Sequence, residues 1–227
     1  MTQSPLDNPV WSALTTTHAA LAIGDGAARR YPEEICPMVG IATTEAAGYD
    51  ALREVLPGGS RVPLFLDTPA PPPFPVLYAR DIDQMVLPGA VPPLDPGMAE
   101  MVRSLEAESS AEMLELVALT KPGPFGPRTV ELGDYVGIRD GGRLVAMAGV
   151  RLRPVGFSEI SGVCVHPDWQ GRGYGRAMTQ AVAARVAARG ETAFLHVKTD
   201  NLAARNAYLK LGFQVRRTIH LRVVSLP

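Results

Sequence analysis

The sequence has few cysteines, almost no net charge and no long apolar run, and each absence excludes a class of protein. Only two cysteines, Cys36 and Cys164, occur in 227 residues, so the disulfide framework of a small secreted domain is not expected. The formal net charge of −1 provides no sequence-wide attraction to nucleic acid or to an anionic membrane. We therefore expect neither nucleic acid nor membrane as a partner.

The chain also lacks the segments that direct proteins into or across membranes. No apolar run reaches the roughly 20 residues of a transmembrane helix, and residues 1–7 lack the basic and apolar parts of a signal peptide. A hydrophobic content of 46% is enough for a buried core, so disorder is excluded. The expectation is a cytoplasmic α/β protein, either monomeric or homodimeric.

Proline-rich segments suggest how the chain is divided. The run Pro88–Gly97 suits neither a helix nor a central strand, and we place a domain boundary near residue 95. Residues 1–95 would form an accessory α/β region, and residues 96–227 a second domain. In the first region the pattern predicts helices over 9–23 and 45–56, and strands over 61–66 and 76–86.

The second region alternates strands and helices. It contains Asp140-Gly-Gly142 between two apolar runs, which predicts a β-hairpin. The predicted elements are a helix over 97–119, strands over 134–139, 143–152 and 159–165, a helix ending near 189, a strand over 192–197, a helix after 201 and a final strand pair across 213–224. Together they predict a mixed α/β sheet with helices on both faces.

A glycine-rich turn separates the strand that ends at Val165 from the helix that follows. Gly171, Gly173 and Gly175 have no Cβ and allow close approach of a ligand to the backbone. The first N–H groups of a helix lack partners within it, and the positive end of its dipole favours an anion. Arg172 and Arg176 add positive charge. The expected ligand is an anion, with pyrophosphate as the leading candidate.

Two common phosphate-binding motifs do not fit this turn. A P-loop requires Lys-Ser or Lys-Thr after its last glycine, whereas Gly175 is followed by Arg176 and Ala177. A dinucleotide fingerprint requires the spacing G-x-G-x-x-G, which Gly171, Gly173 and Gly175 do not have. The segment instead resembles motif A of the GCN5-related N-acetyltransferases (GNATs), Gln/Arg-x-x-Gly-x-Gly/Ala, here at residues 170–175.

A second segment strengthens the resemblance. Asn201, Ala204, Tyr208 and Gly212-Phe213 match the family pattern Asn-x-x-Ala-x-x-x-Tyr-x-x-x-Gly-Phe. From the residues alone, Asn201 is expected to cap a helix that ends at Gly212. The resemblance covers roughly residues 98–227, and residues 122–125 and 144–149 are most similar to the FR47-like branch of the family. Gly24-Asp-Gly26 is only a partial copy of motif A, so a degenerate second GNAT half in the N-terminal region stays open.

The resemblance implies an acyltransferase that uses acetyl-CoA as a co-substrate and needs no metal. The motif-A turn would bind the pyrophosphate, the preceding strand the pantetheine arm, and Asn201 the region near the thiol. The residues that the resemblance assigns to coenzyme binding are Val163, Cys164, Val165, Gln170, Gly171, Arg172, Gly173, Tyr174, Gly175, Arg176 and Asn201.

The catalytic assignments also depend on the resemblance. Glu159 lies eleven residues before Gln170, where histone-acetylating members carry a glutamate base; alternatively it is an ordinary carboxylate paired with Arg151 or Arg153. His196 is a rival base, since the members that acetylate ribosomal-protein N-termini have a glutamate at its offset from Asn201. A histidine in an apolar strand is otherwise a hydrogen-bonded core residue.

Tyr208 is the candidate general acid, because a phenol can protonate a departing thiolate. Its alternative role is packing on a short helix. Strand alternation would place Glu159 on the same face as Ser161, Val163 and Val165, and Cys164 on the other. Cys164 is then expected to be a small buried apolar residue rather than a nucleophile.

The predicted function is transfer of an acetyl group from acetyl-CoA to a primary amine of a small molecule or amino acid. Two alternatives remain open: a protein N-terminal or lysine acetyltransferase, and a non-catalytic CoA-binding regulatory module. They differ in the acceptor, whose binding groove the sequence does not define.

Overall fold

The computed structural model of the protein describes residues 4–227; the first three residues, part of the segment considered for a signal peptide, lie outside this range. Eight strands form one sheet in the order β3-β10-β4-β9-β8-β7-β6-β5. Their bounds are β3 (Arg61–Leu66), β4 (Val76–Val86), β5 (Arg103–Leu105), β6 (Tyr135–Asp140), β7 (Arg143–Val150), β8 (Phe157–Val165), β9 (Thr192–Lys198) and β10 (Gln214–Ser225). All pairings are antiparallel except that of β8 with β9.

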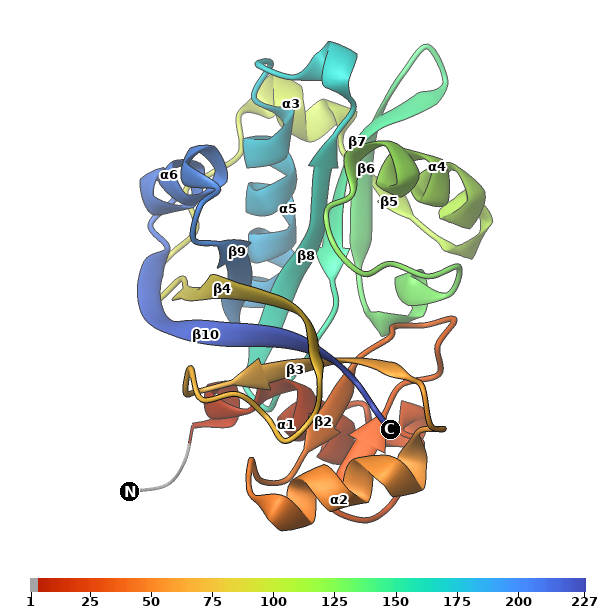
Figure 1. Ribbon diagram of the computed structural model, residues 1–227. Coiled ribbons are helices and arrows are strands. Elements are labelled where there is room, and N and C mark those ends of the chain that lie inside the picture. The colour runs from red at the N-terminus through yellow and green to blue at the C-terminus, as the bar shows by residue number, and fades with distance from the viewer. Residues whose placement is uncertain (1–3) are drawn as a thin grey trace.

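Helices cover both faces of this sheet, as predicted, and the expected mixed α/β fold is confirmed (Figure 1). The helices are α1 (Pro9–Thr15), α2 (Ala46–Val55), α3 (Pro96–Met101), α4 (Ser110–Thr120), α5 (Tyr174–Ala188) and α6 (Leu202–Lys210). The main core lies between the sheet and α5, and a second cluster packs the opposite face against α4. Within residues 4–227, no helix combines the length and apolarity needed to cross a membrane.

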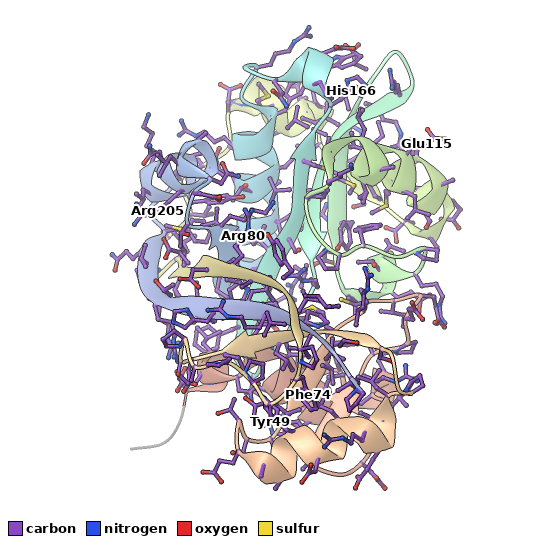
Figure 2. The ribbon with its side chains drawn as sticks, in the orientation of Figure 1. Tyr49, Phe74, Arg80, Glu115, His166 and Arg205 are labelled. Atoms are coloured by element: carbon purple, nitrogen blue, oxygen red, sulfur yellow. The ribbon has the colours of Figure 1, made fainter. Side chains whose placement is uncertain are left out.

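Within the N-terminal region, α1, α2 and a small sheet of β1 (Ala28–Arg30) and β2 (Val39–Ile41) lie below β10 in Figure 1. One of its clusters is local and includes Tyr49 and Phe74, which lie near α2 in Figure 2. Another cluster is shared, because residues such as Leu14 and Tyr31 pack with Phe194 of β9. Hydrogen bonds also join the regions, including one from the Thr129 hydroxyl to the Ile35 carbonyl.

The sheet crosses the boundary predicted near residue 95. Strand β4, from before the boundary, lies between β9 and β10 and pairs with both, and β3 forms the edge beyond β10. The division into regions 1–95 and 96–227 therefore stays a prediction, and the strand pairings do not follow it.

Three predicted elements were wrong in detail. The helix expected over 97–119 is two helices, α3 and α4, because residues 103–105 pair as β5 with β6 and bury Leu105. The helix expected over 9–23 ends as α1 at Thr15, before a short 3₁₀ turn. The final strand pair is one long strand, β10, which contains no glycine, proline, asparagine or aspartate to form a turn.

Candidate active site

The glycine-rich turn joins the end of β8 to the start of α5 (Figure 1). Gly171 and Gly173 adopt φ angles of 78° and 81°, a region that side-chain-bearing residues rarely occupy. The first helical bond runs from the Ala177 N–H to the Gly173 carbonyl, so the N–H groups at the helix start are open to a ligand. This arrangement fits a diphosphate.

Positive charge and an aromatic side chain border the turn. Arg172 and Arg176 are exposed and have no ion-pair partner among residues 4–227. Trp169, which the sequence analysis did not single out, donates from Nε1 to Asp140 Oδ2 over 2.8 Å and lies 5.9 Å from the Arg172 guanidinium. The indole therefore fastens the turn to the β6–β7 hairpin. His166 lies between β8 and the turn, and its Nδ1 accepts the Asp168 N–H.

Strands β8 and β9 separate just where the candidate residues lie. They pair only from Phe157 to Glu159 on the β8 side, and beyond this point the β8 edge that faces β9 has no strand partner among the residues that the structure describes. Unpaired strand N–H and C=O groups can pair with an extended ligand. Residues Val163 to Val165 lie along this open edge, between the sheet opening and the α5 turn.

A bulge in β8 overturns one prediction about side-chain direction. Ser161 pairs with Gly149 and Cys164 with Met147, so three steps along β8 match two along β7, and Gly162 takes a φ of 63° to accommodate the extra residue. The alternation therefore shifts at Gly162. Cys164 packs in the α4-side cluster, whereas Val163 and Val165 pack toward α5.

Simple alternation predicted that Glu159 shares a face with Val163 and Val165, and this prediction is wrong. Glu159 lies on the Cys164 side of the sheet. Cys164 is nevertheless the buried apolar residue that was expected. Burial raises the pKa of the Cys164 thiol to about 11, so it is protonated at neutral pH and poorly suited to nucleophilic attack.

Tyr208 reaches the sheet opening from α6. Asn201 caps this helix, as predicted, by accepting the Ala204 N–H at 3.2 Å. The half-buried Tyr208 ring packs edge-on against Phe213, with the ring centroids 5.9 Å apart. Burial raises the pKa of Tyr208 to about 12, and its hydroxyl has no hydrogen-bond partner among residues 4–227. It is thus a protonated donor that is free to bind a ligand.

A cavity of about 270 Å³ begins at the sheet opening, where Val163 and Tyr208 line it, and continues over the sheet face that the N-terminal region covers. Strand register places alternate residues of β3, β4, β9 and β10 on this one face. Its lining side chains include Phe65, Tyr78, Arg80, His196, Lys198 and Leu221.

Glu159 lies behind this cavity in a buried charged network. Its carboxylate accepts from Arg151 Nε and Nη2 over 2.9 and 2.7 Å, and Oε1 lies 2.7 Å from His196 Nδ1. Burial alone would raise the pKa of Glu159, but Arg151 and His196 outweigh it and hold this pKa at about 2. Glu159 raises the pKa of Arg151 above its ordinary value in turn.

The network bears on the choice of base. Glu159 is 1% exposed, and both of its oxygens are occupied. The second ring nitrogen of His196, Nε2, lies 3.3 Å from the Gln84 amide nitrogen, which also donates to the Leu6 carbonyl. Of the alternatives considered for Glu159, the pairing with Arg151 is present, whereas its role as a base stays a prediction.

Comparison with known proteins agrees with this architecture. The family described as FR47-like protein matches residues 135–223. A solved structure from Novosphingobium aromaticivorans, assigned to the GNAT family of acetyltransferases, is 33% identical with a TM-score of 0.90, over 99% of this chain and 100% of that one. A GCN5-related N-acetyltransferase from Kribbella flavida, 17% identical, shares the fold with a TM-score of 0.61, over 93% of each chain.

Matches to curated relatives are shorter. The N-alpha-acetyltransferase RimI of Mycobacterium tuberculosis is 42% identical over 84 residues. The aligned stretch covers 35% of this chain and 51% of RimI. The mycothiol acetyltransferase of Mycolicibacterium smegmatis is 36% identical over 78 residues. The aligned stretch covers 33% of this chain and 26% of that enzyme. The chain thus spans about half or less of these relatives. The full-length match to the Novosphingobium structure shows that the chain belongs to the GNAT family of acetyltransferases.

Proposed function

We propose that the protein transfers an acetyl group from acetyl-CoA to the primary amine of an amino acid or other small molecule. One observation carries the proposal: the unpaired edge of β8 runs between the glycine-rich turn at residues 171–176, with its open helix-start N–H groups, and the Tyr208 hydroxyl. A CoA molecule laid along this edge would place its pyrophosphate at α5 and its sulfur near Tyr208.

Acetyl-CoA supplies a thioester: the amine nitrogen forms a C–N bond to the carbonyl carbon, the C–S bond breaks, the nitrogen loses a proton and the sulfur gains one. Backbone N–H groups along Val163–Val165 would hold the pantetheine arm and steady the carbonyl oxygen. Tyr208, whose pKa of about 12 exceeds the value of about 8.5 for a thiol, would donate a hydrogen bond to the sulfur as it gains charge.

The acceptor amine must reach the reaction in its neutral form. A lysine-like amine, with a pKa of about 10.4, is almost fully charged at neutral pH, whereas an α-amino group near 8 is partly neutral. Among the described residues that line the cavity there is no aspartate or glutamate, and Glu159 is bound by Arg151. We therefore favour an α-amino group as the acceptor, because it depends least on a strong base.

A peptide N-terminus is a second candidate, since it presents the same kind of amine. The 42% identity to a protein named as an N-alpha-acetyltransferase supports it. The similarity to a mycothiol acetyltransferase supports the small-molecule candidate in the same way.

The test is release of CoA thiol from acetyl-CoA with three acceptor groups: amino acids, peptides with free N-termini, and polyamines. The same peptides with acetylated N-termini serve as controls without a free α-amine. We expect turnover with α-amino acceptors and none with the controls. Binding of CoA without turnover by any amine would contradict the proposal and support the non-catalytic alternative.

A further inference from the structure

We infer that the acceptor carries a carboxylate close to its amine, and that Arg80, assisted by Lys198, binds this carboxylate. The inference rests on the proposed function and narrows the acceptor to a free amino acid or a similar amino carboxylate. Figure 2 shows Arg80, which belongs to β4, near the middle of the molecule.

The charges around the cavity are of one sign. Arg80, Arg151 and Lys198 line it, together with apolar side chains from β3 and β10, and within the described part of the chain no carboxylate does so. An acceptor with several ammonium groups, such as a polyamine, would meet repulsion without a counter-charge. A ligand with one anionic group and an apolar body fits both features.

Strand alternation explains this separation of charge. Arg80 and Ile82 point to the cavity face of β4, while Asp81 and Asp83 point to the other face. There the two aspartates already have partners: Asp81 lies 2.8 Å from His220 Nδ1, and Asp83 accepts from Arg205 Nε over 2.8 Å. The acidic residues of β4 therefore do not neutralise the cavity.

The three cations of the cavity differ in how far they are compensated. Arg151 is neutralised by Glu159 behind it. Arg80 is half-buried and uses only Nη1 to contact Asp200, whose side chain is 70% exposed. A guanidinium has five N–H groups, so most of those on Arg80 remain for a ligand.

Lys198 adds a second charge at the solvent-exposed end of the cavity. It is an exposed residue without an ion-pair partner among residues 4–227. It lies directly across from Ile82 in the β4–β9 pairing. Ile82 follows Arg80 by two positions on β4, so all three side chains are on the same face of the sheet. A carboxylate held by Arg80 would therefore also be within the field of the Lys198 ammonium.

The test compares N-acetyl-leucine with N-acetyl-leucinamide, measured by calorimetric titration in the presence of CoA. These product-like ligands have no titrating amine and differ only in the carboxylate, so the measurement does not depend on turnover. We expect N-acetyl-leucine to bind at least about 10-fold more tightly, as for a charge-assisted hydrogen bond. Added salt should weaken this preference.

Variants assign the preference to the two cations. Arg80→Gln should lower affinity for N-acetyl-leucine about 10- to 100-fold, whereas Asp200→Asn, which removes the competing carboxylate, should raise it. Lys198→Met should lower it less, and Lys210→Met on α6 is the matched lysine control. Thermal unfolding of each variant checks that it is folded. If Arg80→Gln does not fold, the loss of affinity for N-acetyl-leucine in Lys198→Met tests the site instead.

Two results would overturn the inference. Equal binding of the two ligands to the unaltered protein would exclude a carboxylate site, and acetyl transfer to leucinamide would then point to peptide-like acceptors and leave the proposed function intact. If Arg80→Gln lowers the affinity for CoA as much as the affinity for N-acetyl-leucine, Arg80 binds the coenzyme and not the acceptor carboxylate. Absence of acetyl transfer with every amine would count against the proposed function, and the binding comparison would still decide the carboxylate site.

Discussion

The two sides of the cavity are built in different ways. The side proposed for the coenzyme is mostly one continuous segment, because β8, the glycine turn and α5 follow one another from Phe157 to Ala188. The side proposed for the acceptor is assembled from β3, β4, β9 and β10, which come from both ends of the chain and meet through strand pairing. The first side is a compact local unit, and the second exists only when the whole sheet has formed.

This difference suggests that the two sides bind different ligands. A local segment with fixed backbone geometry suits a ligand that does not vary, such as the pyrophosphate of a coenzyme. A surface made of separate strands can change its side chains at Phe65, Tyr78 or Arg80 without disturbing that segment. Changes on the two sides should therefore have separable effects on the coenzyme and on the acceptor.

The largest expected effect comes from removing residues 1–95. A fragment of residues 96–227 would lack β4, which separates β9 from β10, and would expose Phe194 and other residues of the shared core. We expect no cooperative thermal unfolding in circular dichroism. The control is the full chain cut within residues 88–95 after purification, which should stay folded because every strand is retained.

If the isolated fragment instead folds cooperatively and binds CoA, the boundary predicted near residue 95 marks an independent domain. The contrast between a local and an assembled side would then lose its main support.

The same contrast explains how much could be predicted from the sequence. The hairpin around Asp140-Gly-Gly142, the β8–α5 turn and the Asn201 cap depend on neighbouring residues, and the structure shows each of them. The pairing of β4 with β9 and β10 depends on residues more than 100 positions apart. Local chemistry does not specify such a partner, so the acceptor side could not be located.

The error about the face on which Glu159 lies has a different, local origin. Alternation along a strand is reliable until a bulge inserts a residue, and Gly162 offered only a weak sign of one. The available sequence signal was the glycine within an apolar strand, and the structure gives Gly162 the positive φ of a bulge.

A large loss of stability is expected from Glu159→Gln. Arg151 is 8% exposed at its side chain, and the substitution leaves it buried without a counter-charge, which costs about 3–5 kcal/mol. Glu191→Gln is the matched control: it breaks the more exposed pair with Arg153 and should cost less. Urea unfolding gives both free energies.

Acid provides a second measurement of the same residue. Because the pKa of Glu159 in the folded protein, about 2, is below its ordinary value of 4.5, its ionised form stabilises the fold above pH 4.5. That contribution is lost as the pH falls from 4.5 toward 2, and Glu159→Gln should lack this dependence. Unchanged stability, with an activity loss that shrinks at high pH, would show that Glu159 is a free base instead.

Next in size is the effect of Gly173→Asp on CoA binding. Aspartate at a φ of 81° is strained, and its carboxylate would repel a pyrophosphate at the helix start. We expect CoA affinity to fall about 100-fold or more by calorimetry. Gly190→Asp is the control, since Gly190 also has a positive φ of 72° with no neighbour near its Cβ position but lies at the other end of α5. Equal affinities for the two variants would exclude the turn as the anion site.

Tyr208→Phe should slow acetyl transfer by about 100-fold, the lower range for a proton donor, with little change in CoA affinity. The ring and its contact with Phe213 remain, so stability should hardly move. The deficit should shrink with an acyl donor whose thiol is more acidic. Single-turnover rates test this, with Tyr78→Phe as the control for a cavity hydroxyl on the acceptor side. Equal rates for Tyr208→Phe and the unaltered protein would limit Tyr208 to packing.

The smallest expected effect tests the acceptor side alone. Phe65 lines the cavity and its ring lies 5.5 Å from that of His196, so Phe65→Leu removes apolar contact from an acceptor and not from CoA. We expect a 5- to 10-fold higher KM for the acceptor, equivalent to about 1 kcal/mol of apolar contact, at unchanged CoA affinity. Phe74→Leu is the control: Phe74 packs on Tyr49 away from the cavity (Figure 2) and should change stability without changing KM. If Phe65→Leu lowers CoA affinity and leaves the acceptor KM unchanged, the two sides are not separable and the N-terminal strands serve the coenzyme.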